Sequence, residues 1–430
     1  MAKESLTVDL DQITSKIGIP DSRQHLLPNW QQAQQEFPAT LYFLENRFVE
    51  AACRATYLPD PIIDSVLACA RCVAEEPALQ ALAWYGVFCH YHCPDYPTRN
   101  ADQWPLLHHA LGEHSHMFYL LVLLAGYPQM HAVHRDHQLP TDVIRESMGH
   151  ILHRMNEYRL EHGIWGLDAH GARWLSNYMR GEIYAFGRLV HQFGVFQNPV
   201  RVYRCNQTHE TGYSQVIALS EDGVRYRKDG QLFRSEDDDH DTWLAHLELN
   251  GKEVKGCPIL PSGSVLPQPI TLDTNQWHMV LGPTDPALFF HIPSGSPMQL
   301  HLCLESMRKA LEFFPRYFPE KRIAAFYTKS WLLDGQLSEM LSPQSNIVRL
   351  QNHAYMFPHR IADRLILKTV FGSEQPKHDR CKTSLERAMT HHLSSGSPFR
   401  ARGGGGFVLP EEVRSARGYH ENLFPWSIIN

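Results

Sequence analysis

The chain contains 430 residues, of which 43% are hydrophobic and 20% are charged, and its formal net charge is −6. This length exceeds what one hydrophobic core supports, so about two or three domains are expected. The acidic balance and the lack of a basic block argue against a partner that is nucleic acid or an anionic membrane surface.

The chain carries no targeting or membrane signal that we can identify. Its first residues, MAKESLTVDLDQ, are polar and lack the apolar core of a signal peptide. The longest apolar run, Met117 to Gly126, is about half the length needed to cross a bilayer. The cysteines number nine, an odd count without a secretory signal, and indicate reduced thiols. We therefore expect a cytoplasmic protein without membrane insertion.

The first part of the chain has a helical pattern. Apolar residues recur at three- and four-residue spacing from Pro38 to about Phe196, with prolines at segment edges. This pattern predicts an all-helical N-terminal domain over residues 1–198. The expected helices are Ala39–Ala52, Asp60–Ala74, Pro77–Cys89, Gln103–Gly126, Pro140–His162 and Gly171–Gln192.

The pattern changes to short alternating runs after Asn198, which predicts strands. We expect a second domain over residues 199–430, with a leading sheet segment at 199–275 and a core at 276–410. The leading strands are Val200–Cys205, Ser214–Leu219, Gly223–Arg227 and Trp243–Leu249. The core is expected to contain strands Trp277–Leu281, Ala287–Ile292, Arg322–Thr328, Asn346–Leu350 and Gly403–Leu409, and helices Met298–Phe314, Leu333–Leu341, Pro358–Phe371 and Cys381–Leu393. The predicted class is α+β, a helical domain followed by a mixed sheet flanked by helices.

The loop Ser294-Gly295-Ser296 connects an expected strand directly to an expected helix. The first N–H groups of a helix are unpaired and carry partial positive charge, so this loop is a candidate anion site. A plain turn explains the same residues equally well, with Ser296 as the N-cap and Pro297 as the first helical residue.

Titratable side chains gather at the neighbouring strand ends. His291 ends the first strand, Tyr327 and Lys329 end the second, and Asp285 lies in the turn before the first. Amide formation from a thioester needs a proton acceptor for the amine and a proton donor for the leaving sulfur. His291 can accept the proton, and Tyr327 or the adjacent Ser330 can return one. The alternative is that His291 and Tyr327 are half-buried strand residues with satisfied hydrogen bonds.

Several sequence strings resemble a known protein family. They are His291-Ile-Pro-Ser-Gly-Ser-Pro-Met298, Ser306 to Phe318, Ser330-Trp-Leu-Leu-Asp334, Ser345-Asn-Ile347, Trp174-Leu175, Gly181-Glu-Ile183 and Phe186-Gly-Arg-Leu189. Together they resemble a bacterial family of acyltransferase domain-containing proteins, which joins a helical N-acyltransferase N-terminal domain to a GNAT-like C-terminal domain. The resemblance covers about residues 38 to 410 and implies an N-acyltransferase.

The resemblance also implies a donor site. In GNAT enzymes the pantetheine arm of the acyl donor lies between two splayed parallel strands, here 287–292 and 322–328. The implied donor-binding residues are Ile292, Pro293, Ser294, Gly295, Ser296, Thr328 and Lys329. The implied donor is acyl-CoA or an acyl-carrier-protein pantetheine, and the implied acceptor is an amine, for which a peptide side chain is one candidate.

The glycine pattern typical of the GNAT phosphate loop is absent after His291, which keeps the carrier protein open as a donor. The one match, Arg400-Ala-Arg-Gly403-Gly-Gly405, precedes a strand instead of a helix. We interpret it as a glycine-rich approach to the last strand.

Two hypotheses from other classes remain. One is a metal-binding helical protein, because His109, Glu113 and His116 would share one face of a continuous helix. No HExxH string occurs, and a chain with 27 histidines produces such spacings by chance, so we expect no metal. The other is a GNAT-like binding module without catalysis, in which side chains fill the groove beside His291 and Tyr327.

Overall fold

The computed structural model describes residues 9–93, 103–208, 212–234, 241–371, 381, 383–396, 399, 401–402, 404–420 and 423–429. The chain separates into two compact units, Met1–Ala185 and Phe186–Asn430, and each is described by itself. Our division into functional domains at residue 198 is retained as a proposal. The first eight residues, on which part of the targeting prediction rests, lie outside the described residues.

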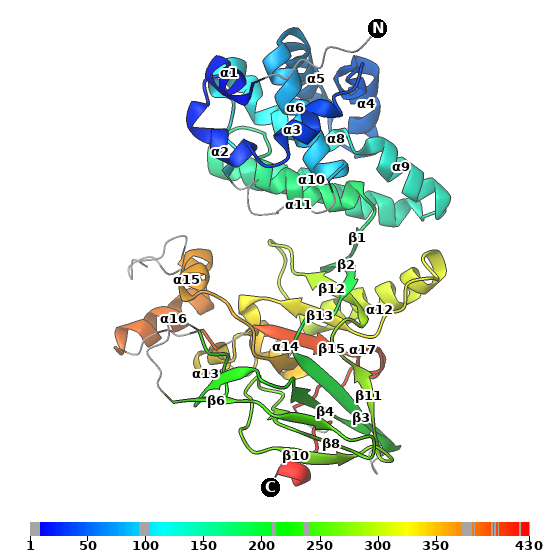
Figure 1. The fold of residues 1–430 in the computed structure, drawn as a ribbon, viewed down its shortest axis with the longest axis vertical. Coiled ribbons are helices and arrows are strands. Elements are labelled where there is room, and N and C mark those ends of the chain that lie inside the picture. Colours follow the sequence, from blue (N-terminus) through cyan, green and yellow to red (C-terminus); the bar gives the residue numbers. More distant parts are fainter. Residues whose placement is uncertain are drawn as a thin grey trace. The chain divides into compact units, whose positions relative to one another are not determined.

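The first unit is helical until its last residues, as predicted (Figure 1). Its α-helices are α1 (Leu10–Lys16), α2 (Arg23–Leu26), α3 (Trp30–Gln35), α4 (Asn46–Ala55), α5 (Asp60–Glu75), α6 (Pro77–Tyr91), α7 (His108–Leu111), α8 (Phe118–Leu124), α9 (Tyr127–Asp136), α10 (Thr141–His162) and α11 (Ala169–Met179). Short 3₁₀ helices are η1 (Pro20–Ser22), η2 (Tyr42–Leu44) and η4 (Gly112–Met117). Helices α6 and α8 are buried almost all round, which explains their weak amphipathic pattern in the sequence.

The prediction of one helix over Gln103–Gly126 is wrong. Gly112 has a φ of 53°, a left-handed conformation that ends α7, and the chain continues as the 3₁₀ helix η4 before α8 begins. His109, Glu113 and His116 therefore do not lie on one continuous helix, and the geometric basis of the metal hypothesis is lost.

The prediction of a helix over Gly171–Gln192 is wrong after Met179. The chain forms β1 (Ile183–Phe186) and β2 (Leu189–Val195), joined by a turn in which Gly187 has a φ of 72°. The run from Ile183 is rich in β-branched and aromatic residues, which favour strands. A continuous apolar run of this kind does not by itself separate a buried strand from a buried helix.

The leading part of the second unit is formed by short antiparallel strands. They are β3 (Val200–Thr208), β4 (Ser214–Ser220), β5 (Arg225–Arg227), β6 (Thr242–Leu244), β7 (Leu247–Leu249), β8 (Glu253–Gly256), β9 (Pro258–Ile259), β10 (Ile270–Asp273) and β11 (Trp277–Leu281). They form three small sheets, in the orders β11-β3-β4-β9, β10-β8-β7 and β5-β6. The predicted single strand Trp243–Leu249 is wrong, because it is two strands in different sheets, and Trp277–Leu281, predicted in the core, pairs here with β3. Arg204 of β3 donates to Glu412 at 2.9 Å, an almost buried ion pair that joins this segment to the end of the core.

The core of the second unit is a six-stranded mixed sheet in the order β1-β2-β12-β13-β15-β14 (Figure 1). Its further elements are β12 (Pro286–His291), α12 (Leu300–Tyr317), β13 (Phe326–Lys329), η5 (Trp331–Leu333), α13 (Gln336–Met340), α14 (Asn346–His353), β14 (Tyr355–Phe357), α15 (Asp363–Phe371), α16 (Ser384–Ser394) and β15 (Gly405–Val408). Two helices follow, α17 (Pro410–Ser415) and α18 (Trp426–Ile429). Strands β12 and β13 are parallel, and the remaining neighbours with a defined register are antiparallel.

The two faces of this sheet are covered differently. On one face, Phe193 of β2 packs against Phe314 of α12 with ring centroids 4.4 Å apart. On the other face, aromatic side chains of β13, β15 and β14 form the core with the leading strands, and Tyr355 and Phe407 stack at 5.0 Å. Helix α12 therefore covers one side of the paired strands and leaves the opposite side to aromatic rings.

The predicted strand at Asn346–Leu350 is wrong, because this segment is helix α14. Ser345 has extended backbone angles and its hydroxyl accepts from Val348 N at 3.3 Å, which makes it an N-cap. The strand of this region follows as β14. The predicted helices at 358–371 and 381–393 correspond to the shorter α15 and α16.

The predicted last strand is confirmed as β15, and its glycines have a packing reason. A Cβ atom on Gly405 would lie 2.1 Å from Cε2 of Phe357, so only glycine fits between β13 and β14.

We expect Gly405→Ala to lower the free energy of unfolding by about 1–3 kcal/mol through overpacking. Urea unfolding would show this. Gly194→Ala is the matched control, because its Cβ would meet the nearest atom at 3.6 Å and should change the midpoint little; equal midpoints for the two variants would contradict the packing argument.

Candidate active site

The parallel strands β12 and β13 diverge at their C-terminal ends. Within the described strands they are in register only at Leu288–Phe326 and Phe289–Tyr327. Beyond these pairs, β12 continues beside β2 as far as His291, whereas β13 continues beside β15 as far as Lys329. Beyond the pair Phe289–Tyr327, β12 and β13 therefore follow different neighbouring strands. This is the splayed pair that the family resemblance implies.

A cavity of about 490 Å³ opens beside these strand ends. Ile292 follows β12 directly and Leu332 belongs to η5, which follows β13, so both strand ends contribute to its wall. The wall also includes the first residues of α14 and α16, whose N–H groups carry partial positive charge. Its lining is half apolar and half polar: Arg188, Ile292, Ser296, Met298, Leu332, Leu341, Gln344, Ser345, Asn346, Ile347, Ser384 and Leu385.

Arg188 is a residue of this site that the sequence prediction missed. It lies in the β1–β2 turn, where its Nη1 donates to Pro293 O at 2.9 Å and its Nε donates to Pro297 O at 3.3 Å. These bonds fix the loop after β12. Burial lowers the pKa of the Arg188 guanidinium, which remains a cation in the cavity wall. The predicted helix over this segment hid a turn residue, although Phe186-Gly-Arg-Leu189 was among the family strings.

The loop itself differs from the simple turn that we predict. Helix α12 begins at Leu300 instead of Met298, with Gln299 at the N-cap position, so Ser296 is not the N-cap and Pro297 is not the first helical residue. Gly295 has a φ of 100°, which requires glycine. Ser294, Gly295 and Ser296 are exposed, Ile292 and Pro293 are half-buried, and Ser296 and Ile292 face the cavity.

His291 is the predicted proton acceptor at the strand ends. Its Nε2 lies 3.0 Å from Gln192 Oε1 on the neighbouring β2, and its ring lies 4.7 Å from that of Phe289. Burial lowers the pKa of His291 to about 4, so the imidazole is neutral near pH 7. A neutral, hydrogen-bonded imidazole at the end of a strand can accept a proton without first losing one.

Tyr327 lies on the same sheet face as His291, one on each side of Phe289. Its ring is perpendicular to that of Phe289 at 5.0 Å, and its hydroxyl donates to Val195 O at 2.8 Å. The side chain is 7% exposed, and burial raises the pKa of the phenol. His291 and Tyr327 therefore each contact the Phe289 ring, and the Tyr327 hydroxyl donates its proton to a backbone carbonyl. Its role as a proton donor stays a prediction.

Lys329 ends β13 and shares a sheet face with Tyr327, because alternate residues of a strand point to the same side. Its Nζ donates to Gln197 O at 3.5 Å, and burial lowers its pKa. His359 is half-buried, and burial together with the charge of Lys329 lowers its pKa to about 4. Lys329 and His359 are thus two further basic side chains near the end of β13.

The other predicted residues are dispersed. Thr328 is buried within β13. The hydroxyl of Ser330 accepts from Leu332 N at 3.3 Å and caps η5. Asp285 lies at the start of β12, where its carboxylate accepts from Gly282 N at 2.7 Å. The six residues of β12 separate it from His291 by about 20 Å at the usual rise per residue, so the two cannot act on one substrate atom.

Within the described ranges, no three His, Cys, Asp or Glu side chains gather closely enough to hold a metal ion. Likewise, no helix in the described part of the chain is both long and apolar enough to span a bilayer.

Buried neutral histidines make the second unit sensitive to acid. Burial lowers the pKa of His191 to about 3 and the pKa values of His291, His353 and His359 to about 4. The unfolded chain binds these protons below pH 6.5, whereas the folded chain does not. Stability is therefore expected to fall as pH decreases from about 6.5 towards 4. Burial raises the pKa of Asp334 to about 6 and also raises the pKa of Glu412, so these two carboxyl groups act in the opposite direction, but they are two groups against four.

This expectation can be checked by urea unfolding at about pH 7.5 and about pH 5. The urea midpoint should be lower at the acid pH. An unchanged or higher midpoint at about pH 5 would show that these histidines are not held neutral in the folded state.

Comparison with known families supports this reading of the fold. Residues 183–406 match the family model of the GNAT-like C-terminal domain, and residues 47–181 match that of the N-acyltransferase N-terminal domain. No curated protein matches the chain.

Solved structures of similar fold cover nearly the whole chain. An acyltransferase in complex with decanoyl-CoA and teicoplanin is 20% identical, with a TM-score of 0.60 over 94% of this chain and 99% of that chain. An acyltransferase mutant in complex with octanoyl-CoA is 21% identical, with a TM-score of 0.60 over 94% and 100% of the two chains. At this identity the likeness is one of fold. The match to the GNAT-like model spans more than half of the chain, and this protein therefore belongs to the GNAT-like acyltransferase family, with an N-acyltransferase N-terminal domain before the GNAT-like C-terminal domain.

Proposed function

We propose that this protein transfers an acyl group from the thioester of acyl-CoA to the nitrogen of an amine acceptor. The observation that carries the proposal is the divergence of β12 and β13 beside a cavity of about 490 Å³. Parallel strands that separate expose backbone donors and acceptors to a ligand lying between them, as an amide-containing pantetheine arm requires.

The cavity suits the two ends of such a donor. Apolar side chains, including Met298, Leu341 and Leu385, can cover a flexible chain. Arg188 and the first residues of α14 and α16 supply positive charge for the diphosphate. The charge is distributed over several elements, which explains how a diphosphate can be bound without the usual glycine pattern.

The reaction needs one proton to leave the attacking ammonium and one to reach the departing sulfur. In the proposed mechanism His291 Nδ1 accepts the first, while Nε2–H donates to Gln192 Oε1 and so holds the imidazole in place. The amine nitrogen then attacks the thioester carbon and the carbon–sulfur bond breaks. The nitrogen gives up its second proton to solvent, the thiolate is protonated, and the proton donor regains its proton from solvent. Tyr327 and Ser330 are the residues that we propose for the second proton.

The acceptor is an amine, and a peptide amine is the finer proposal. The solved acyltransferase structures include complexes with teicoplanin and with 10C-Teicoplanin. A peptide acceptor is a natural extension of that fold likeness, and an acyl-carrier protein remains an alternative donor.

The function can be tested by intact mass spectrometry of amine and peptide mixtures after incubation with acyl-CoA of several chain lengths and with an acyl-carrier protein. The proposal predicts an acceptor whose mass increases by one acyl group, with release of free CoA. Transfer from the carrier protein alone would reassign the donor. No adduct from any donor would favour the binding module without catalysis.

A further inference from the structure

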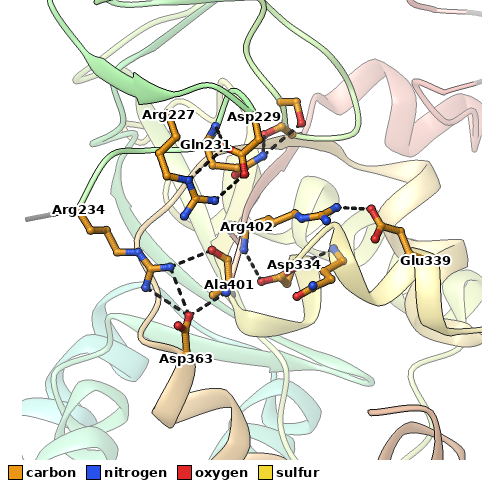
Figure 2. A network of polar contacts seen from close by, with 12 residues as sticks. Arg227, Asp229, Gln231, Arg234, Asp334, Glu339, Asp363, Ala401 and Arg402 are labelled. Carbon is orange, nitrogen blue, oxygen red and sulfur yellow. Dashed lines mark hydrogen bonds and ion pairs between the residues drawn. The ribbon is translucent and has the colours of Figure 1, made fainter. Parts of the chain in front are cut away.

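Two features near the site have no role in the mechanism above: the buried Asp334, which ends the string Ser330-Trp-Leu-Leu-Asp334, and the glycine-rich segment before β15. The structure places them in direct contact. Asp334 Oδ2 accepts from Arg402 N at 2.8 Å, and Asp363 Oδ1 accepts from Ala401 N at 2.8 Å. Figure 2 shows both carboxylates directed at this one stretch of backbone.

The next anchor along the segment comes from the end of β13. Ser330 N donates to Gly404 O at 2.6 Å. A Cβ atom on Gly404 would lie 2.5 Å from Ser330 O, and one on Gly406 would lie 2.7 Å from Leu333 Cδ1. The segment thus lies in close contact with both β13 and η5, and a shift of one requires a shift of the other.

Asp334 is the central group of this arrangement. Its side chain is buried, and its second oxygen accepts from Gln336 N at 2.9 Å. Its backbone carbonyl accepts from Gln351 Nε2, which also donates to Leu332 O at 2.8 Å. Leu332 lines the cavity of the proposed donor site. Asp334 therefore connects the cavity wall, the end of β13 and the approach to β15.

Burying a carboxylate costs free energy, even when it accepts from two backbone N–H groups. A buried charged group can be retained because it stabilises one arrangement of the chain around it. The nearby cation is the Arg402 guanidinium, which is paired with Glu339. Asp363 is the nearby like charge, and it is paired with Arg234 at 3.3 Å. These charged groups, together with Asp229 beyond Arg402, surround the Asp334 carboxylate (Figure 2).

We propose that Asp334 is a positioning residue for acyl transfer, which holds the end of β13 against β15 and so sets the gap between β12 and β13. The inference rests on the proposed function, because the gap matters only if a thioester lies in it. A reacting group displaced by about 1 Å can lose on the order of a hundredfold in rate.

The first test is Asp334→Asn, assayed for kcat, for KM of octanoyl-CoA and for the ratio of CoA released to acyl-amine formed. The asparagine amide accepts from one N–H and opposes the other, so kcat should fall by about ten- to a hundredfold while KM changes less than about threefold. More CoA should be released per product. Asp229→Asn is the control, because Asp229 binds Arg227 and Gln231 N and touches neither β13 nor β15; it should retain the wild-type ratio.

The pH profile gives a readout that a merely structural role would not move. Burial raises the pKa of Asp334 to about 6, and the protonated acid cannot accept from both N–H groups. The wild-type kcat should therefore fall as pH decreases through about 6, a range in which His291 stays neutral. This acid limb should be absent in Asp334→Asn.

Arg402→Met keeps the backbone N–H and serves if Asp334→Asn does not fold. Losing the guanidinium raises the pKa of Asp334, so the acid limb should move to higher pH. The inference is overturned if Asp334→Asn has wild-type kcat and coupling, or if Arg402→Met leaves the limb in place. No transfer by the wild type would overturn the proposed function and this inference with it, whereas normal transfer in both variants would overturn the inference alone.

Discussion

Replacing His291 by alanine is expected to lower kcat for acyl transfer by about a hundred- to ten-thousandfold, because the reaction loses its proton acceptor. KM for acyl-CoA should change little, since His291 is not among the residues that line the donor cavity. Steady-state assays that follow free CoA and acyl-amine together would measure both quantities.

The neighbouring residue provides the control for this prediction. Gln192→Ala removes the hydrogen bond that orients the imidazole but leaves the base in place, so its effect on kcat should be smaller, about tenfold. Rescue of His291→Ala by added imidazole would support the assignment. Wild-type kcat in His291→Ala would remove His291 from the mechanism without affecting the fold.

Replacing Arg188 by methionine is expected to have the second largest effect. It should weaken binding of the acyl donor and leave the chemical step unchanged. The variant loses the cation in the cavity wall and both bonds to the loop at Pro293 and Pro297. Hydrogen bonds to charged groups contribute about 1.5–3 kcal/mol each, so KM for acyl-CoA should rise at least about tenfold. Calorimetric titration with CoA would measure the same loss as a change in Kd.

Two further variants separate charge from geometry. Arg188→Lys keeps the charge but lacks the planar fork that reaches two carbonyls, so it should recover only part of the affinity. Arg316→Met removes an arginine at the other end of α12 and should bind CoA as the wild type does. Equal weakening in Arg188→Met and Arg316→Met would indicate a general charge effect and no specific role for Arg188.

The sequence predicted the centre of the second unit well, for identifiable reasons. The strand-loop-helix from Ala287 to Phe314 combines an apolar run, turn residues and a strongly amphipathic helix, and it appears as β12 and α12. The last strand was found from its glycines and apolar residues. Both segments carry local signals that tertiary packing does not override.

Other segments could not be assigned from local signals. Asn346–His353 contains Ile347, Val348 and Leu350, which favour a strand, but the cap at Ser345 and burial of one face make it a helix. Ile183–Val195 is rich in apolar residues without a clear period, and only its place in the sheet identifies it as two strands. The prediction of the site residues was limited in the same way. His291 could be named as a candidate because it ends a recognisable strand, whereas Arg188 and Gln192 lie in a segment predicted as helix.

Contacts between segments that are far apart along the chain could not be predicted from the sequence. Nothing in the spacing of Asp334 and Arg402, 68 residues apart, indicates that one binds the backbone of the other. Asp285 shows the reverse case, because it is near His291 in sequence but at the opposite end of the same strand. Proximity of residues along the chain identified candidate groups, and the sheet register decided which of them can meet.

The central claim is that the acyl donor lies in the cavity at the diverging ends of β12 and β13. Photolabelling with a photoreactive acyl-CoA, followed by peptide mass spectrometry, tests it most directly. The account predicts labels on the peptides that contain Arg188, Ile292–Met298, Leu332, Leu341–Ile347 or Ser384–Leu385, suppressed by excess CoA and reduced in Arg188→Met. Labels that excess CoA suppresses but that fall outside these segments would contradict it.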